Sequence, residues 1–502
     1  MKQVLDLARK SNRANAACAI FIAGLTSSAL LGQTFTTVLS FDYADGATPL
    51  GGLAQGLSGN LYGVTDYGGA NGSGTIFKVT PGGTVTTLYS FCPQQSCPDG
   101  DKPSGLVQAT NGNFYGTTYS GGAYGSGTVF TITPAGVLTT LYSFCANVLN
   151  DVCTDGNNPI GGVIQATNGD FYGTTLGGGA HDGGTVFKIT PSGALTTLYS
   201  FCLLNLCADG AYPEAGLVQA TNGNLYGTTS NGGANGPLGT VFEITPAGGL
   251  TTIYSFCKET NCADGDTPTA AMIQGSNGNL YGTTDWGGAN ANSQYCYVLY
   301  GGGCGTIFEI TLGGALTTLY SFCSQAGCAD GYDPNTPLVQ ATNGNLYGTT
   351  TDGGAAQEGE IFEITPAGAL TVEYSFCTQG GGCPNGSYPY AGLVQDTNGE
   401  LYGEAQDGGS GSVGTVFSFS VGLGPFIEAR PGAGKVGAAV SILGTNLAGA
   451  TTVTFNGTGA TFNVISSSEI ATTVPDGATS GKIKVVTPSR TLSSNAPFHV
   501  LP

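Results

Sequence analysis

The chain has 502 residues, of which 40% are hydrophobic and only 9% charged, and its formal net charge is −19. The length accommodates one large domain and a smaller one. Because the chain is acidic and carries no basic stripe to neutralise phosphates, we exclude nucleic acid as a partner.

Residues 1–32 are predicted to be a signal peptide. Basic residues between Lys2 and Arg13 precede Ala16–Leu31, a run of apolar and small residues that is short for a membrane anchor. An uncleaved signal anchor is the alternative, and the cleavage site, after Ala29 or Gly32, stays open. No other stretch approaches a membrane span. We expect the protein to be secreted, extracellular or on the cell surface, with the periplasm as another location. We also expect it to be a monomer.

Residues 34–420 are dominated by one repeat that occurs seven times. Its Tyr-Gly core recurs at Tyr62, Tyr115, Tyr172, Tyr226, Tyr281, Tyr347 and Tyr402. The second repeat illustrates the four strands that we predict in each copy, at residues 105–109, 113–118, 128–133 and 137–144. Asn111-Gly112 between the first two indicates a type I′ hairpin turn. A period near 50 residues with four antiparallel strands is typical of a propeller blade.

The two ends of the repeat region are incomplete in complementary ways. Residues 34–41 match a fourth strand with no repeat before them, and the last repeat stops after its third strand, residues 415–420. The N-terminal strand is therefore predicted to complete the seventh blade, which removes two exposed sheet edges. We expect an all-β fold in which residues 33–421 form a closed seven-bladed β-propeller.

The cysteines also indicate export. Apart from Cys18, they form seven close pairs, which we predict to be disulfides made in an oxidising compartment: Cys92 with Cys97, Cys145 with Cys153, Cys202 with Cys207, Cys257 with Cys262, Cys296 with Cys304, Cys323 with Cys328, and Cys377 with Cys383. A zinc site is the weaker interpretation, because each pair offers two ligands and His181 and His499 are the only histidines. We expect neither a metal nor a cofactor.

Residues 425–501 contain short alternating strands at the spacing of a β-sandwich. The pieces V-x-I-x-G-x-N, beginning at Val440, and V-x-F-N-G, beginning at Val453, resemble the IPT/TIG family of immunoglobulin-like domains. The resemblance covers the whole of this segment. It implies a compact immunoglobulin-like sandwich that contacts ligands or partners, often as a spacer.

The repeat itself resembles the GloVer tandem repeat of secreted bacterial proteins of the choice-of-anchor type. The resemblance rests on N-G-N-L-Y-G-T-T-x-x-G-G, G-T-V-F-x-I-T-P-x-G and L-x-x-L-Y-S-F, which recur in essentially every copy. It covers about three quarters of the chain. The family has no established chemistry that would carry over to these residues.

Binding residues are expected on the loops after the second and fourth strands, because these loops vary on an otherwise rigid repeat. The fifth repeat departs most, since it holds the only tryptophan and an aromatic insertion closed by a predicted disulfide. Aromatic rings beside carboxylates are suited to stacking on sugars; the alternative is that the aromatics pack the insertion against its own blade. The candidate ligand-binding residues are Asp66, Tyr67, Tyr119, Asp285, Trp286, Tyr295, Tyr297, Tyr300, Asp352 and Asp407.

No nucleophile elbow, phosphate loop or histidine cluster occurs, so we predict that the chain is not an enzyme. We expect a secreted binding or adhesion module for an extracellular glycan or a surface protein. The alternatives are a carbohydrate-active hydrolase or lyase, for which Asp66 and Asp407 are a candidate pair, and a structural surface or matrix protein. The recurrent Asp-Gly before each repeat is interpreted as an Asx turn, with a calcium ligand as the alternative.

Overall fold

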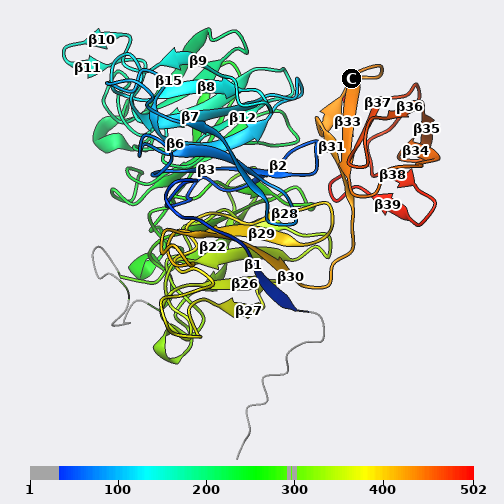
Figure 1. The fold of residues 1–502 in the computed structure, drawn as a ribbon. Coiled ribbons are helices and arrows are strands. Elements are labelled where there is room, and N and C mark those ends of the chain that lie inside the picture. The colour runs from blue at the N-terminus through cyan, green and yellow to red at the C-terminus, as the bar shows by residue number, and fades with distance from the viewer. Residues whose placement is uncertain (1–32, 291–295, 297–301, 502) are drawn as a thin grey trace, which may run out of the picture.

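The computed structural model describes residues 33–290, 296 and 302–501, and this part of the chain is all-β (Figure 1). Among the described residues the helical segments are three single 3₁₀ turns, η1 (Asn205–Cys207), η2 (Thr260–Cys262) and η3 (Ala326–Cys328). Each ends at the second cysteine of a disulfide. The insertion tyrosines Tyr295, Tyr297 and Tyr300 lie outside the described residues.

Each repeat forms a four-stranded antiparallel sheet, and the structure contains seven such repeat sheets within the described residues. The first three consist of β2 (Ala54–Gln55), β3 (Leu61–Thr65), β4 (Thr75–Val79) and β5 (Val85–Ser90); β6 (Asp101–Gln108), β7 (Phe114–Ser120), β8 (Thr128–Ile132) and β9 (Leu138–Ser143); and β12 (Val163–Gln165), β13 (Phe171–Thr175), β14 (Thr185–Ile189) and β15 (Leu195–Ser200). A small hairpin, β10 (Val148–Leu149) and β11 (Val152–Cys153), precedes the third.

The remaining repeat sheets follow the same order of strands. They consist of β16 (Val218–Gln219), β17 (Leu225–Thr229), β18 (Thr240–Ile244) and β19 (Leu250–Ser255); β20 (Ile273–Gln274), β21 (Leu280–Thr284), β22 (Thr306–Ile310) and β23 (Leu316–Ser321); β24 (Val339–Gln340), β25 (Leu346–Thr350), β26 (Glu360–Ile364) and β27 (Leu370–Ser375); and β28 (Val394–Gln395), β29 (Leu401–Ala405) and β30 (Thr415–Ser420) with β1 (Thr34–Ser40). In the seventh repeat sheet, β1 pairs antiparallel with β30, from Thr34 opposite Ser420 to Ser40 opposite Thr415.

The Asn-Gly turn differs in detail from the prediction. Gly112 has a φ of +83°, but Asn111 is not among the residues with positive φ, so the turn is not type I′. Asn111 instead accepts a hydrogen bond from the Asn113 backbone at 3.0 Å and donates one to the Tyr115 hydroxyl at 2.9 Å. An Asx-type turn of this kind needs a single glycine in the left-handed region.

A chain of glutamine hydrogen bonds joins the seven sheets in sequence and returns to the first. Gln108 of the second sheet accepts the Leu57 N–H of the first at 2.8 Å, and Gln55 accepts the Thr397 N–H of the seventh at 3.1 Å. The glutamines that complete the series are Gln165, Gln219, Gln274, Gln340 and Gln395. Each of these bonds satisfies a backbone donor in the turn of the preceding sheet.

Aromatic contacts between sheets follow the same order. A phenylalanine after the fourth strand meets the phenylalanine of the third strand of the next sheet, as Phe41 meets Phe77 with ring centroids 5.1 Å apart. The other pairs are Phe91–Phe130, Phe144–Phe187, Phe201–Phe242, Phe256–Phe308, Phe322–Phe362 and Phe376–Phe417. Neighbouring sheets are therefore held together by buried edge-to-face ring pairs, which contribute beyond the area they bury.

The fourteen paired cysteines form seven disulfides within the described residues. The aspartate of the Asp-Gly pair organises the loop that most of these disulfides close. Asp264, for example, accepts the Tyr254 hydroxyl at 2.7 Å and the Lys258 N–H at 3.0 Å. Asp99, Asp155, Asp209 and Asp330 bond a tyrosine and backbone amides in the same way. These carboxylates therefore accept hydrogen bonds within the loop, although Asp99 Oδ1 has no partner.

The C-terminal residues form two further four-stranded sheets over a shared core. One contains β31 (Ile427–Arg430), β33 (Ala439–Gly444), β37 (Glu469–Thr473) and β36 (Phe462–Val464), and the other β35 (Thr458–Ala460), β34 (Thr452–Phe455), β38 (Ile483–Val486) and β39 (Thr491–Ser493). Buried residues of both sheets, among them Ile442 and Ile470 from the first and Phe455 and Val485 from the second, pack in one cluster. A short parallel pair, β32 (Ala433–Gly434) and β40 (His499–Val500), completes this region.

The C-terminal sheets lie to one side of the repeat sheets, next to β2 and β28 (Figure 1). Arg430 Nη1 donates to the Gln55 carbonyl at 2.6 Å, and its guanidinium also pairs with Glu428. Ser468 Oγ donates to the Leu57 carbonyl at 2.8 Å, and Asn495 Nδ2 donates to the Gln340 carbonyl at 2.9 Å. The C-terminal region is thus bonded to the first and sixth repeat sheets at the end where their first two strands are joined by a turn.

Candidate functional site

Near the start of the first strand, each repeat has a residue whose backbone lies in the left-handed region of φ and ψ, and a proline follows it. These residues have φ between +53° and +57°, although none is glycine: Thr48, Lys102, Asn158, Tyr212, Thr267, Asp333 and Tyr388. Each backbone N–H donates to a carbonyl of the preceding repeat, as Lys102 does to Ser73 at 3.2 Å. The backbone is therefore the same in every copy, while the side chain differs in charge, size and polarity.

Two further positions vary beside it. The residue after the proline is Leu50, Ser104, Ile160, Glu214, Thr269, Asn335 or Tyr390, and the residue that follows the Tyr-Gly strand core by three positions is Asp66, Tyr119, Leu176, Ser230, Asp285, Thr351 or Gln406. Hydrogen bonds of 2.7 Å join the two positions in Ser230–Glu214, Thr269–Asp285 and Thr351–Asn335. We call the residues at these three positions the variable face.

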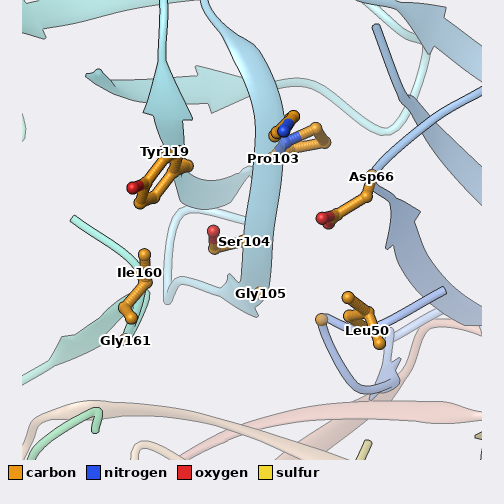
Figure 2. A pocket seen from close by; sticks show the side chains of 10 residues that line it. Leu50, Asp66, Pro103, Ser104, Gly105, Tyr119, Ile160 and Gly161 are labelled. Carbon is orange, nitrogen blue, oxygen red and sulfur yellow. The ribbon is translucent and has the colours of Figure 1, made fainter. Parts of the chain in front are cut away.

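A pocket of about 510 Å³ opens on the variable face of the first three repeats (Figure 2). Figure 2 shows Asp66 and Tyr119 pointing into it from opposite sides, with Ser104 between them. Leu50 and Ile160 supply apolar walls, and Lys102 also lines the pocket. The arrangement offers an aromatic ring, a carboxylate, a hydroxyl and an ammonium group to one ligand of small-molecule size.

Burial controls the charge of Asp66. Desolvation raises the pKa of its carboxyl group to about 6; the Lys102 ammonium opposes this shift, and Asp101 adds to it. Lys102 also lies over the Tyr67 ring, with Nζ 5.0 Å from the ring centroid. Asp66 therefore titrates near neutral pH.

The variable face of the fourth to sixth repeats is acidic. Desolvation, with a smaller contribution from the charges of Asp333 and Glu214, raises the pKa of Asp285 to about 8 against the hydrogen bond from Thr269. Desolvation and the nearby Asp352 raise the pKa of Asp333 to about 7. The pKa of Asp285 thus depends on carboxyl groups of the two neighbouring repeats.

The structure separates the candidate binding residues into groups. Asp66 and Tyr119 line the pocket, with Tyr67 beside them under Lys102, and Asp285 belongs to the acidic part of the variable face. Trp286, Asp352 and Asp407 occupy the next position along the chain, where their backbones bridge to Asp266, Tyr332 and Ser387. Trp286 is half-buried rather than exposed. Asp407 does not line the pocket that contains Asp66.

Several residues of the site were not predicted. Lys102, Ser104, Leu50 and Ile160 line the pocket, and Glu214 and Asp333 contribute to the acidic part. The sequence does contain a pattern that identifies them. Every repeat has a proline at this place, and the residues on either side of it differ from copy to copy. Comparison of the copies with one another would have found them.

The sulfur atoms of Cys296, Cys304, Cys323 and Cys328 lie within 4.8 Å of one another. They belong to two disulfides, Cys296–Cys304 and Cys323–Cys328. Since the thiolate is the form that binds metal, these oxidised sulfurs do not form a metal site.

Models of known families match most of the chain. The Gloeobacter/Verrucomicrobia repeat matches residues 22–152, 146–301 and 292–463, and the IPT/TIG domain matches residues 429–500. The chain belongs to the Gloeobacter/Verrucomicrobia repeat family. Both resemblances found in the sequence are confirmed. Among curated protein sequences, none matches this chain.

Several solved structures are similar to this chain at low sequence identity. The extracellular domain of a hybrid two-component system from B. thetaiotaomicron is 13% identical, with a TM-score of 0.49; the match covers 93% of this chain, which spans 58% of that one. A fungal alcohol oxidase in complex with copper is 10% identical, with a TM-score of 0.50 and coverage of 94% and 99%. A gluconolactonase from Xanthomonas campestris is 13% identical, with a TM-score of 0.35 and coverage of 67% and 88%.

The prediction that the chain is not an enzyme is contradicted, because the fold of this chain is also the fold of an enzyme, the alcohol oxidase. The inference failed because it relied on sequence motifs of other folds. A single fold supports unrelated chemistries through the residues placed on its loops, so the lack of a familiar motif does not exclude catalysis.

Two observations bear on location. Seven disulfides are typical of proteins that fold in an oxidising compartment. In the part of the chain that the structure describes, no helix has the length and hydropathy to cross a bilayer.

Proposed function

We propose that the chain is a secreted protein in which residues 33–421 form a closed seven-bladed β-propeller and residues 425–501 an immunoglobulin-like sandwich. The glutamine series and the phenylalanine pairs support closure, because each returns from the seventh sheet to the first. The shared core of the two C-terminal sheets supports the sandwich.

The function that this geometry supports best is recognition of an extracellular glycan on the variable face. The observation that carries the proposal is the pocket in which Tyr119 faces Asp66 across Ser104 (Figure 2). An aromatic ring stacks on the apolar face of a sugar, and the carboxylate and hydroxyl bind its hydroxyl groups. Variation confined to a few positions on a constant backbone is the arrangement expected of a recognition surface.

A glycan array followed by calorimetry on the chain from Gln33 to Pro502 tests this proposal. We expect Asp66→Asn and Tyr119→Ala to weaken binding about tenfold or more, because each removes a contact made inside the pocket. Tyr124→Ala is the matched control, since Tyr124 is 57% exposed and does not line the pocket. Unchanged affinity in both pocket variants, or no glycan bound, would overturn the proposal.

Affinity should also depend on pH through Asp66. With a pKa of about 6, this group is mostly protonated at pH 5 and mostly ionised at pH 7. Ionised carboxylates accept stronger hydrogen bonds than neutral ones, so binding should tighten as pH rises between these values. The Asp66→Asn protein should lack this dependence.

A second candidate function rests on the acidic part of the variable face. Asp285 and Asp333, with pKa values raised to about 8 and about 7, have the protonation expected of acid and base groups working near neutral pH. We expect hydrolysis or elimination of a polysaccharide, with Asp285→Asn reducing the rate at least about a hundredfold. Release of reducing or unsaturated ends measures it, with Glu259→Gln as an exposed control; equal rates in wild type and Asp285→Asn would contradict this function.

A further inference from the structure

A second cleft lies where the C-terminal sheets meet the seventh repeat sheet, on the Asn-Gly turn side. It has a volume of about 270 Å³ and is lined by Asn398 of the repeat region and by Thr445, Asn446, Thr487, Ser489 and Arg490 of the C-terminal region. Hydrogen bonds fix its walls, since Phe426 N–H donates to the Thr397 carbonyl at 3.0 Å and the Thr397 and Thr445 hydroxyls are 3.0 Å apart. The cleft is therefore formed only when the two regions are joined.

The lining is polar, and Arg490 is its one charged residue. Arg490 presents a guanidinium group, and it has no acidic partner among the described residues, whereas Arg430 pairs with Glu428. The side-chain amide of Asn446 is exposed beside it. The Ser489 hydroxyl is bonded to the Thr487 hydroxyl at 3.2 Å, and Thr487 in turn donates to the Arg490 carbonyl at 3.0 Å. Asn398 is already occupied, because its Oδ1 accepts the Glu400 N–H and its Nδ2 donates to Tyr402.

Charge distinguishes this cleft from the rest of the molecule. Residues 33–424 contain 28 acidic and four basic side chains, whereas residues 425–502 contain three acidic and five basic ones. An anion is repelled by most of this surface and finds its most favourable potential on the C-terminal region. No carboxylate lines the cleft.

We propose that this cleft binds a small oxyanion, the carboxylate or sulfate group of an acidic ligand. The planar guanidinium of Arg490 matches such a group with two parallel hydrogen bonds, and the side-chain amide of Asn446 supplies a further donor. The site is separate from the pocket at Asp66. That pocket lies at the opposite ends of the repeat strands and contains a carboxylate of its own. The cleft at Arg490 thus holds the acidic group of a saccharide, whereas the pocket at Asp66 holds a neutral sugar.

Calorimetry on the chain from Gln33 to Pro502 tests the proposal at low, constant ionic strength. The probes are sodium glucuronate and sodium sulfate, with glucose as the neutral counterpart of glucuronate. We expect glucuronate or sulfate to bind and Arg490→Gln to weaken that binding about tenfold or more, as expected for a charged hydrogen-bonding partner. Binding of both probes identifies the oxyanion alone as the ligand, and binding of glucuronate alone adds the sugar ring.

Two further variants keep the result interpretable. Lys435→Gln removes an exposed cation of the same region outside the cleft and should leave affinity within about twofold. Asn446→Asp keeps the shape of the side chain but places a negative charge in the cleft, and should abolish binding. The proposal is overturned if neither anion binds, or if Arg490→Gln and Lys435→Gln lower affinity equally. Asp66→Asn should leave this binding unchanged, so the two sites are tested separately.

Discussion

Removal of residues 33–41 is expected to lower the thermal midpoint of the protein by roughly 5–10 °C and to promote aggregation. This segment contains β1, which supplies the outer strand of the seventh repeat sheet through its pairing with β30. It also carries Phe41, which is fully buried, and Phe35, which stacks on Tyr374 with ring centroids 4.0 Å apart. Loss of the buried Phe41 ring costs about 3–5 kcal/mol, and the exposed edge of β30 becomes free to pair with another chain.

Complementation makes this test specific. A synthetic peptide of residues 33–42 added to the shortened chain should restore part of the lost midpoint, because the vacant edge accepts only a strand with the matching side chains. A peptide of the same composition in scrambled order is the control. Equal midpoints for the full and shortened chains would show that β1 does not close the ring, whatever the peptide does.

The second large effect is expected at Glu404, in the middle of β29. Five of the six other repeats place threonine at this position and the first places Val64, yet Glu404 is fully buried. Its Oε2 accepts the Gly52 N–H at 3.0 Å, and its Oε1 has no hydrogen-bond partner. Desolvation raises the pKa of this carboxyl group to about 8, against the opposing effect of the bond from Gly52.

The sign of the pH dependence follows from linkage. The folded-state pKa of about 8 lies above the ordinary value of 4.5, so the folded protein keeps a proton that the unfolded chain loses. The contribution of Glu404 to the free energy of unfolding is therefore complete below about pH 4.5 and declines as pH rises towards 8. At pH 8 the loss is on the order of 2–4 kcal/mol.

Glu404→Gln should remove this decline. We expect the variant to gain stability relative to the wild type between pH 5 and pH 8, with little difference between the two proteins at pH 5, as measured by urea unfolding at both values. Glu404→Thr introduces the residue that five of the other repeats have at this position. Its stability should also lack the decline between pH 5 and pH 8. The exposed Glu259→Gln is the control; a stability difference for Glu404→Gln that is the same at both pH values would disprove the assignment.

The sequence by itself determined the repeating part of this protein. The strands, the glycine turns, the paired cysteines and the pairing of residues 34–41 with the last repeat were all predictable, because each depends on nearby residues or on a pattern that recurs seven times. The turn at Asn111-Gly112 was predicted in place but not in type, since Asn111 uses its side chain instead of a left-handed backbone. Local hydrogen bonds of this kind leave no distinct trace in the residue pattern.

Only the tertiary structure decided which of the variable residues meet. Asp66, Lys102 and Ile160 belong to three repeats and line one pocket because each sheet is bonded to the next. Asp285 and Glu214 approach each other for the same reason, and Arg490 faces a cleft that exists only after the C-terminal sheets bond to the repeat region. These residues are far apart in the chain and differ in every copy, so no local or periodic pattern joins them. Their meeting depends on the packing of sheet against sheet, and that packing is visible only in the folded chain.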